Sequence, residues 1–184
     1  MQAVILAAGK STRMHPLTLD KPKPLLKLNG KTLIEYSLDQ LKGITDEAVI
    51  VVGYKKEMIK RHLGMNYKGL KLAYVSQAKQ LGTAHALKLC REKLNDEFIV
   101  MMGDDLYDRD DIKALLKYRY AVLAKKVSTP ERFGVFIVKN NKVIDLIEKP
   151  KKFVSDLANT GCYKMDKNIF SMIEKVEKSA RKEY

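Results

Sequence analysis

The stretch "QAVILAAGKSTRM", Gln2–Met14, decides the fold of this 184-residue chain. It begins with an unbroken apolar run that ends at Gly9, which is typical of a strand buried on both faces of a sheet. A glycine at the end of such a strand lets backbone N–H groups come close to a polyphosphate. The stretch therefore predicts an α/β protein with a phosphate-binding turn after its first strand.

The Gly-Lys-Ser-Thr string in this stretch does not predict a P-loop. A P-loop needs a glycine five residues before the Gly-Lys pair, and Val4 occupies that position. The lysine of a P-loop also opens a helix, whereas the segment around Pro16 has the composition of an irregular loop. What remains is a glycine turn followed by three cations, Lys10, Arg13 and Lys23, and this combination favours phosphate binding.

Buried strands alternate with amphipathic helices after the first strand. We expect strands over 47–53, 70–77 and 97–105 and helices over 31–42, 55–64 and 83–94. This alternation predicts a Rossmann-like fold with a mixed, mainly parallel central sheet and helices on both faces. Ligands bind beyond the carboxyl ends of the strands in such sheets. We therefore expect one cleft where four strand ends converge, at Gly9-Lys10, Gly53-Tyr54, Gln77 to Gly82 and Gly103-Asp104.

The pattern changes after Lys113, where strands predominate. We expect them over 120–127, 132–149 and 157–165, with a hairpin turn at Lys139–Lys142. A closing helix is predicted over 167–184, with Asp166 as its N-cap. The prediction is one domain, 1–184, in which a half of alternating strands and helices over 1–112 is followed by a strand-rich half over 113–184.

Composition limits the classes of partner and the location. Lys and Arg number 35 against 22 acidic residues, a net charge of +13, but the lysines are scattered and no RNA-binding motif accompanies them. We therefore expect no nucleic-acid partner, although a basic RNA-binding module remains an alternative. No apolar run is long enough to span a membrane and no signal peptide is recognisable, so we expect no membrane partner and a cytoplasmic location. Cys90 and Cys162 are expected to be buried and reduced.

Six segments of the chain match known motifs: "LAAGKSTRM…KPKPLL", "QAKQLGTAHAL" (Gln77–Leu87), "MGDD", "RFGVFIV", "VIDLIEKPKK" and "LANTGCYKM". In these segments and in their order, the chain resembles the sugar-1-phosphate nucleotidylyltransferases. The resemblance is greatest to N-acetylglucosamine-1-phosphate uridylyltransferases and glucose-1-phosphate thymidylyltransferases. It implies an enzyme that joins a nucleoside triphosphate, UTP or dTTP, to a sugar 1-phosphate with Mg²⁺ and releases pyrophosphate. It also implies that 1–112 is the nucleotide-binding half and 113–184 the sugar-binding half.

The resemblance also implies roles for individual residues. It assigns catalysis to Arg13, Lys23 and Asp104, with Asp104 as the Mg²⁺ ligand and Asp105 as the competing ligand. It assigns the nucleotide to Ala7, Ala8, Gly9, Lys10, Ser11, Thr12, Gln77, Gln80, Gly82 and Thr83, and the sugar to Gly134, Glu148, Lys149, Asn159 and Tyr163. Two of these have structural alternatives, Thr83 as the N-cap of the following helix and Tyr163 as a core residue. The three histidines are not expected to act in catalysis.

The family's catalytic domains continue for several segments beyond Tyr184, and one of those supplies a second metal ligand. Three interpretations follow: a truncated chain, a naturally short enzyme, or a binding domain without turnover, of which we favour a fragment or short member. An alternative enzyme would use CTP with phosphocholine or inositol phosphate. The sequence leaves a homo-oligomer open.

Overall fold

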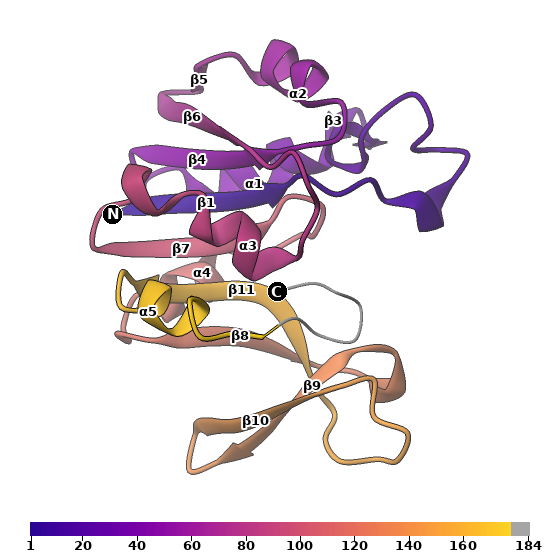
Figure 1. Ribbon diagram of the computed structural model, residues 1–184, viewed down its shortest axis with the longest axis vertical. Coiled ribbons are helices and arrows are strands. Elements are labelled where there is room, and N and C mark those ends of the chain that lie inside the picture. Colours follow the sequence, from indigo (N-terminus) through magenta and orange to yellow (C-terminus); the bar gives the residue numbers. More distant parts are fainter. Residues whose placement is uncertain (178–184) are drawn as a thin grey trace.

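One mixed nine-stranded sheet forms the centre of the computed structural model, which describes residues 1–177 (Figure 1). The strand order is β10-β9-β11-β7-β1-β4-β6-β5, with β8 paired to β11, and β2 and β3 form a separate small sheet. The strands are β1 Gln2–Ala7, β2 Lys27–Leu28, β3 Lys31–Thr32, β4 Glu47–Val52, β5 Asn66–Tyr67, β6 Leu70–Ser76, β7 Glu97–Met102, β8 Ala121–Lys126, β9 Gly134–Lys139, β10 Lys142–Glu148 and β11 Leu157–Asp166. The helices are α1 Leu33–Leu41, α2 Lys56–Leu63, α3 Thr83–Lys88, α4 Arg109–Leu115 and α5 Ile169–Ile173.

The parallel part of the sheet consists of β7, β1, β4 and β6, as the apolar runs predicted. Strand β1 lies between β4 and β7, so that Val4 faces Val49 on one side and Val100 on the other. The later strands β8 to β11 pair antiparallel, and β11 joins them to β7. The predicted fold class, a mixed and mainly parallel sheet with flanking helices, is confirmed.

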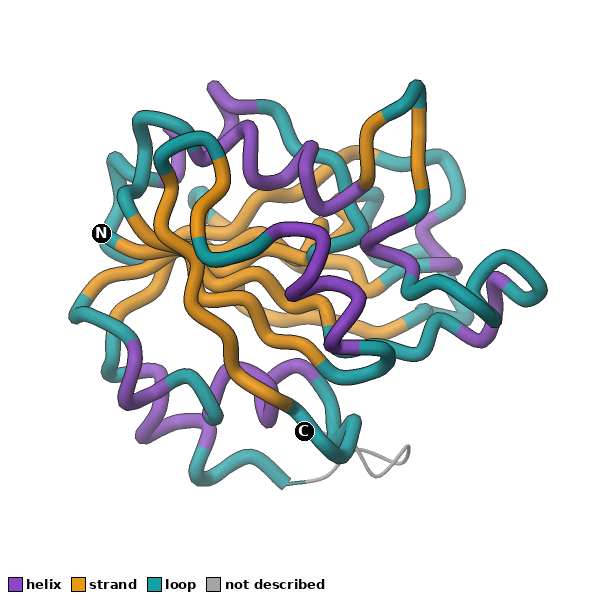
Figure 2. Tube along the Cα trace, turned by 90° about the horizontal axis from the view of Figure 1, so that it is seen from above, coloured by secondary structure: helices purple, strands orange, loops and turns teal. Residues whose placement is uncertain are grey.

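Alternate residues of β1 enter two separate cores, which explains why every residue of the strand after Gln2 is apolar. Ile5 belongs to the core that α1, α2 and α4 cover, whereas Val4 belongs to the core that α3 and α5 cover. Both side chains are fully buried. Figure 2 shows helices on both sides of the sheet. A strand with no polar face is the expected consequence of this two-sided burial.

Helix α1 begins at a capping box rather than at Lys31, where the sequence pattern placed it. The backbone N–H and the hydroxyl of Thr32 both donate to Glu35 Oε2, at 2.8 and 2.6 Å. Gly43 follows the helix with a positive φ of 74°, as expected of a glycine that ends a helix.

Several predicted elements differ from the structure. The helix expected over 83–94 ends at Lys88 and is followed by a separate 3-10 turn at Arg91–Lys93. Helix α4 was not predicted, and position 112, where the two predicted halves meet, lies inside it. The nucleotide-binding and sugar-binding roles of the halves remain predictions.

The prediction for the last helix was wrong in its start and its cap. Helix α5 covers Ile169–Ile173 with Asn168 as its N-cap, and residues 178–184 of the predicted helix lie outside the described residues. Asp166 ends β11 instead. Its carboxylate accepts hydrogen bonds from the Asn168 N–H, from Tyr120 and from Arg119, so long-range partners hold it in place.

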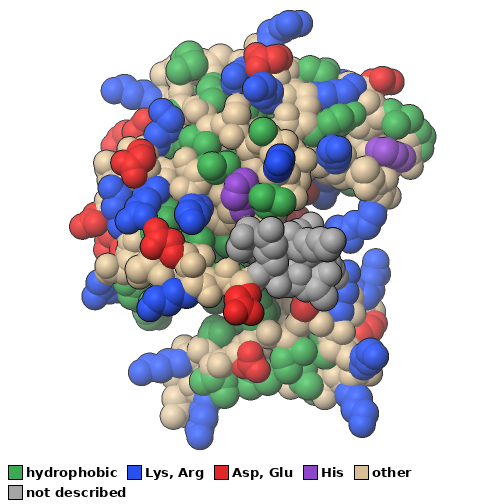
Figure 3. All heavy atoms as spheres, viewed as in Figure 1, with side chains coloured by type: hydrophobic (Ala, Val, Ile, Leu, Met, Phe, Trp, Pro, Cys, Tyr) green, Lys and Arg blue, Asp and Glu red, His purple; other side chains and the backbone are tan. Residues whose placement is uncertain are grey.

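The basic side chains are scattered over the surface, as their positions in the sequence indicated. On the face shown in Figure 3, Lys and Arg side chains are spread over the upper and lower parts of the molecule, with Asp and Glu between them. None of the helices within residues 1–177 is long and apolar enough to cross a membrane.

Cys90 and Cys162 are buried and free, and burial raises the pKa of each thiol to about 12.

Candidate active site

The glycine turn, Gly9–Arg13, follows β1 at the carboxyl edge of the parallel strands. A Cβ added to Gly9 would meet no atom within 4 Å, so the backbone at this position borders open space. Ser11 adopts the left-handed conformation, with φ 51°, and its carbonyl accepts a hydrogen bond of 2.9 Å from the Thr18 hydroxyl. Lys10, Thr12 and Arg13 are exposed. The turn therefore presents backbone and cations to solvent, as phosphate binding requires.

Gly53, at the end of β4, packs directly against this turn. A Cβ at Gly53 would lie 2.6 Å from the Ala8 carbonyl oxygen and 2.9 Å from Gln80 Nε2. The next residue, Tyr54, donates its backbone N–H to the same Ala8 oxygen at 3.2 Å. Only glycine fits here, and the close approach joins the ends of β1 and β4 to the loop after β6.

A hollow of about 340 Å³, which we call the Gln77 hollow, lies where these segments meet. Three predicted nucleotide-binding residues line it together, Lys10, Gln77 and Gln80. Gly53, Tyr54 and Ala78, which the sequence places at the strand ends of the expected cleft, line it as well. The sequence did not single out the last two lining residues, Lys56 and Ser76, and their position beside the ends of β4 and β6 is the signal that could have found them.

Hydrogen bonds fix the Gln77 side chain, which is 3% exposed. Its Nε2 donates to the backbone carbonyl of Gly82 at 3.1 Å and lies 2.9 Å from Nδ1 of His85. The Gln80 amide donates to the backbone carbonyl of Gln77 at 3.4 Å. His85, for which the sequence gave no partner, therefore contacts a predicted base-binding residue. Thr83 is the exposed first residue of α3 and Gly82 is the N-cap, so the alternative of Thr83 as a helix cap was wrong.

Lys23 and Asp104 form an ion pair at the same edge of the sheet. Lys23 begins the 3-10 turn Lys23–Leu25 between two buried prolines, and its Nζ lies 2.7 Å from Asp104 Oδ2. Asp104 follows Gly103, whose N–H donates to the Leu6 carbonyl at 2.9 Å. A Cβ at Gly103 would lie 3.0 Å from the Ala7 Cβ, so this glycine lets the end of β7 lie close to β1.

Asp105 differs from its neighbour in its surroundings. Partial desolvation, followed by the charge of Asp104, raises the pKa of Asp105, and Lys23 offsets part of this rise. The Asp105 carbonyl accepts a hydrogen bond from Ser37 at 3.3 Å, which connects the segment to α1. In residues 1–177 no group of three or more His, Cys, Asp or Glu side chains could hold a metal ion.

Three of the five predicted sugar-side residues, Gly134, Glu148 and Lys149, lie on or directly after the β9–β10 hairpin, at the bottom of Figure 1. Gly134 pairs with Glu148 across this hairpin, and a Cβ at Gly134 would lie 2.9 Å from Glu148 Oε2. The backbone N–H of Lys149 donates to the Phe133 carbonyl at 2.9 Å, and Lys149 has a positive φ of 47°. The three predicted residues Gly134, Glu148 and Lys149 therefore share one end of the hairpin.

Asn159 and Tyr163 interact within an irregular part of β11. Asn159 Nδ2 donates to the Tyr163 hydroxyl at 2.6 Å, and Asn159 Oδ1 accepts from the Gly161 N–H at 2.9 Å. Burial is the main cause that raises the pKa of Tyr163. The Tyr107 hydroxyl donates to the Thr160 carbonyl at 2.9 Å and accepts from the backbone N–H of Met102, the last residue of β7. This bridge places the start of β11 beside the strand end that carries Asp104.

Not every predicted residue has a partner in this arrangement. Lys10 and Arg13 make no hydrogen bond or ion pair within the described chain. Both are exposed cations beside the open backbone of Gly9, which leaves their charges available to an anionic ligand.

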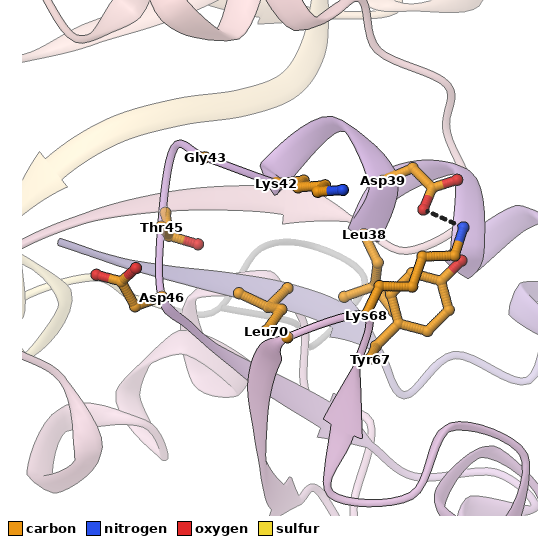
Figure 4. Close-up of a pocket in the computed structure, with 10 residues that line it drawn as sticks. Leu38, Asp39, Lys42, Gly43, Thr45, Asp46, Tyr67, Lys68 and Leu70 are labelled. Atoms are coloured by element: carbon orange, nitrogen blue, oxygen red, sulfur yellow. Dashed lines mark hydrogen bonds and ion pairs between the residues drawn. The ribbon is translucent and has the colours of Figure 1, made fainter.

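A second hollow of about 200 Å³, the Thr45 hollow, contains none of the predicted site residues (Figure 4). Its lining comes from α1, from the turn before β4 and from the β5–β6 turn, at the edge opposite the glycine turn. One wall carries the ion pair of Lys68 Nζ with Asp39 Oδ1, at 2.9 Å. Burial opposes the effect, but hydrogen bonds from Lys31, Lys68 and Tyr67 hold the pKa of Asp39 below its usual range.

A glycine turn, a basic segment and an aspartate at the carboxyl edge of parallel strands are an arrangement typical of α/β proteins that bind phosphorylated ligands. The chain belongs to the nucleotidyl transferase family, because the sequence profile of that family matches residues 2–184. The expected resemblance to sugar-1-phosphate nucleotidylyltransferases is confirmed by the relatives that follow.

The chain is 39% identical to the bifunctional protein GlmU of Methanococcus maripaludis, over 100% of this chain and 44% of that protein. It is 38% identical to the UTP–glucose-1-phosphate uridylyltransferase AglF of Haloferax volcanii, over 100% of this chain and 79% of that protein. The chain thus spans less than half the length of the GlmU relative.

Two solved structures share the fold. A protein assigned as a glucose-1-phosphate thymidylyltransferase from Bacillus anthracis, crystallised with sucrose, matches at a TM-score of 0.87 and 34% identity, over 98% of this chain and 77% of that chain. A UDP-glucose pyrophosphorylase complexed with UDP-glucose matches at a TM-score of 0.87 and 24% identity, over 99% and 82%, which supports the fold alone.

Proposed function

We propose that the chain transfers a nucleotidyl group from UTP or dTTP to a sugar 1-phosphate and releases pyrophosphate. The observation that carries the proposal is the Lys23–Asp104 pair of 2.7 Å, which brings a cation and a carboxylate together at the carboxyl edge of the sheet. The glycine turn and the Gln77 hollow lie at the same edge, which supports binding of the phosphates and the base on one surface.

In the proposed reaction, an oxygen of the sugar phosphate attacks the α-phosphorus of the nucleotide. The bond from the α-phosphorus to the oxygen that bridges to the β-phosphate breaks, and pyrophosphate leaves with that oxygen. The sugar phosphate is already anionic at neutral pH, so no base has to remove a proton from it. Within the described residues, no histidine makes a hydrogen bond or an ion pair with Lys23 or Asp104, which fits a reaction without a general base.

The chain's residues then act by position and charge. Lys23 sits on a turn held between two buried prolines, so its ammonium can stabilise negative charge on the equatorial oxygens of the α-phosphate with little reorganisation. Lys10 and Arg13 are the free cations of the glycine turn and would bind the β- and γ-phosphates. Gln77, Gln80 and Gly82 would bind the base.

The donor set fits Mg²⁺, although it offers few ligands. Magnesium in phosphoryl-transfer sites is held by one or two carboxylates together with substrate phosphates and water. Asp104, with its side chain 32% exposed at the strand end, is the residue that would hold it, and Asp105 is adjacent. When bound, the ion would neutralise charge on the phosphates.

The sugar phosphate would bind between the end of β7 and the β9–β10 hairpin. Glu148 and Asn159 would accept hydrogen bonds from sugar hydroxyls, Lys149 would reach the phosphate, and Gly134 would leave room beside Glu148. Asn159 is already oriented by Tyr163 and Gly161, which reduces the entropy that substrate binding must overcome.

A pyrophosphate-release assay on the full chain tests the proposal. Four nucleoside triphosphates are each combined with a set of sugar 1-phosphates, phosphocholine and inositol phosphate, with and without Mg²⁺. We expect pyrophosphate only when UTP or dTTP, a sugar 1-phosphate and Mg²⁺ are all present. Release with CTP and phosphocholine would contradict the proposed acceptor. Tight nucleotide binding without any release would identify a binding domain instead.

A further inference from the structure

The amide of Gln77 has a fixed orientation, because one of its contacts can only accept a hydrogen bond. Gln77 Nε2 lies 3.1 Å from the carbonyl oxygen of Gly82. A backbone carbonyl has no proton to donate, so the amide group that faces it must be the NH2. The carbonyl oxygen of the amide, Oε1, therefore points to the other side.

His85 accepts a hydrogen bond from the second hydrogen of the same NH2 group. Its Nδ1 lies 2.9 Å from Gln77 Nε2. Since that nitrogen is a donor, Nδ1 must accept, and the proton of the neutral imidazole is then on Nε2. His85 belongs to the first turn of α3 and Gln77 to the loop after β6, so the contact also connects these two segments.

This arrangement leaves Oε1 as the polar atom of Gln77 that a ligand can use. Within residues 1–177, Gln77 makes no side-chain hydrogen bond beyond those to Gly82 and His85. The fully buried side-chain atoms that lack a partner in this part of the chain are Thr45 Oγ1 and Arg109 Nε, so Oε1 is not fully buried, and Gln77 is a lining residue of the Gln77 hollow.

We propose that His85 is a positioning residue for base selection, which holds the Gln77 amide with its oxygen toward the nucleotide base. An acceptor at this position favours uracil or thymine, whose ring N3 carries a hydrogen, over cytosine, whose N3 is itself an acceptor. The inference rests on the proposed function, because it requires the base to bind in the Gln77 hollow. Without His85, only the Gly82 carbonyl opposes a half-turn of the amide that would place the NH2 toward the base.

The first test is independent of any activity. Nuclear magnetic resonance of the full chain labelled with ¹⁵N-histidine reports the protonation of each ring nitrogen, and the His85→Asn variant identifies the His85 signal by its loss. We expect the neutral form of His85 with its proton on Nε2. A proton on Nδ1 in the neutral ring would overturn the inference.

The second test measures the ratio of kcat/KM for UTP to that for CTP. We expect His85→Ala to lower this ratio about tenfold, through a higher KM for UTP, which corresponds to the loss of one hydrogen bond. His85→Asn places an amide oxygen near the position of Nδ1, and we expect it to restore most of the ratio. His62→Ala, which removes an α2 histidine 3.6 Å from Glu35, serves as the matched control and should leave the ratio unchanged.

The outcomes separate this inference from the proposed function. If no combination of substrates yields pyrophosphate, the proposed function fails, and calorimetric affinities for UTP and CTP replace the kinetic ratio. An unchanged ratio in a folded His85→Ala protein overturns the inference. Equal impairment of His85→Asn and His85→Ala would show a structural role only and would also overturn it. If His85→Ala does not fold, the UTP-to-CTP ratio of His85→Asn and the protonation of the His85 ring decide whether the inference holds.

Discussion

Lys23 Nζ lies 2.7 Å from Asp104 Oδ2, although each residue belongs to a different segment of the carboxyl edge. The side chains are 25% and 32% exposed, so water screens their attraction. Partly exposed pairs of this kind stabilise a fold by about 0 to 1 kcal/mol. The pair therefore contributes little to folding, and its proposed role is to place two charges where the phosphates of the substrates would bind.

Asp104→Ala and Lys23→Ala should each lower kcat/KM by about a hundredfold or more, because each removes a charge proposed to act on the phosphates. The free energy of unfolding should change by less than about 1 kcal/mol. Pyrophosphate release and urea denaturation measure the two effects separately. Asp104→Asn keeps the size of the side chain but not its charge, and should be as impaired as Asp104→Ala.

The matched control for these variants is Lys60→Ala. It breaks the ion pair of Lys60 with Glu57 on α2, which has an N–O distance of 3.3 Å and no contact with the site. Activity and stability should both remain near those of the parent chain. A fully active Asp104→Ala protein would contradict the proposed metal ligand.

Gly9→Ala separates binding from stability. The new methyl group would meet no protein atom within 4 Å, so the free energy of unfolding should change by no more than about 0.5 kcal/mol. The methyl would instead occupy the space through which the backbone approaches the phosphates, and we expect the Kd for UTP to rise about tenfold or more. Calorimetry and thermal denaturation measure the two quantities.

Gly53→Ala provides the contrast to this variant. Its Cβ would lie 2.6 Å from the Ala8 carbonyl oxygen, and the backbone must shift to relieve this contact. We expect a loss of about 1 to 3 kcal/mol of stability. Unchanged UTP affinity in Gly9→Ala would show that the phosphates do not lie on the glycine turn.

Gly134→Ala should affect the sugar phosphate and not the nucleotide. The Cβ would lie 2.9 Å from Glu148 Oε2, at the end of an exposed side chain that must move to relieve the contact. That movement displaces a proposed sugar ligand, so the KM for the sugar 1-phosphate should rise severalfold while the KM for UTP stays constant. Steady-state kinetics with each substrate varied in turn decides this. Val143→Ala on the same hairpin, at a 46% exposed residue, is the control.

The strands of the parallel sheet could be predicted because each is a local pattern. Val4 and Ile5 are both fully buried, in different cores, and an unbroken apolar run is the direct result. The glycine turn was predictable for the same reason, since Gly9 follows that run. The family motifs supplied Lys23 and Asp104 separately, but no local pattern indicates that the two side chains touch.

The remaining features depend on contacts between distant segments. Asp166 was expected to cap a helix, yet Arg119 and Tyr120, near the start of β8, bind its carboxylate. His85 has no conspicuous neighbour in sequence, because its partner Gln77 lies across a loop. Such contacts are set by the packing of whole elements, which sequence spacing alone does not encode.

Glu35 should contribute to stability in a pH-dependent way. Burial tends to raise the pKa of Glu35, but hydrogen bonds from the Thr32 hydroxyl and N–H, together with His62, outweigh it and lower the pKa. Because the pKa is lower in the folded state, Glu35 contributes its full stabilisation when the pH is above its unfolded-state pKa of about 4.3. This stabilisation is lost as the pH falls through the folded-state pKa.

Glu35→Gln should therefore cost about 1 kcal/mol at pH 7 and should lose less stability than the parent chain between pH 6 and pH 3. Urea denaturation across this range measures both effects. Thr32→Ala removes the hydroxyl that donates to Glu35, and this variant should also lose less stability than the parent chain between pH 6 and pH 3. Identical acid profiles for the parent and Glu35→Gln would show that this carboxylate is not a source of acid sensitivity.

Thr45→Val should stabilise the fold. Thr45 is 6% exposed, and its Oγ1 is buried without a hydrogen-bond partner within residues 1–177. Valine has the same shape and the same β-branching, so it replaces an unsatisfied hydroxyl by a methyl group that gains from burial. We expect the free energy of unfolding to rise by about 1 kcal/mol, measured by urea denaturation. Thr45→Ser keeps the hydroxyl, loses the methyl group and should be less stable than the parent. A less stable Thr45→Val protein would mean that water in the Thr45 hollow already satisfies the hydroxyl.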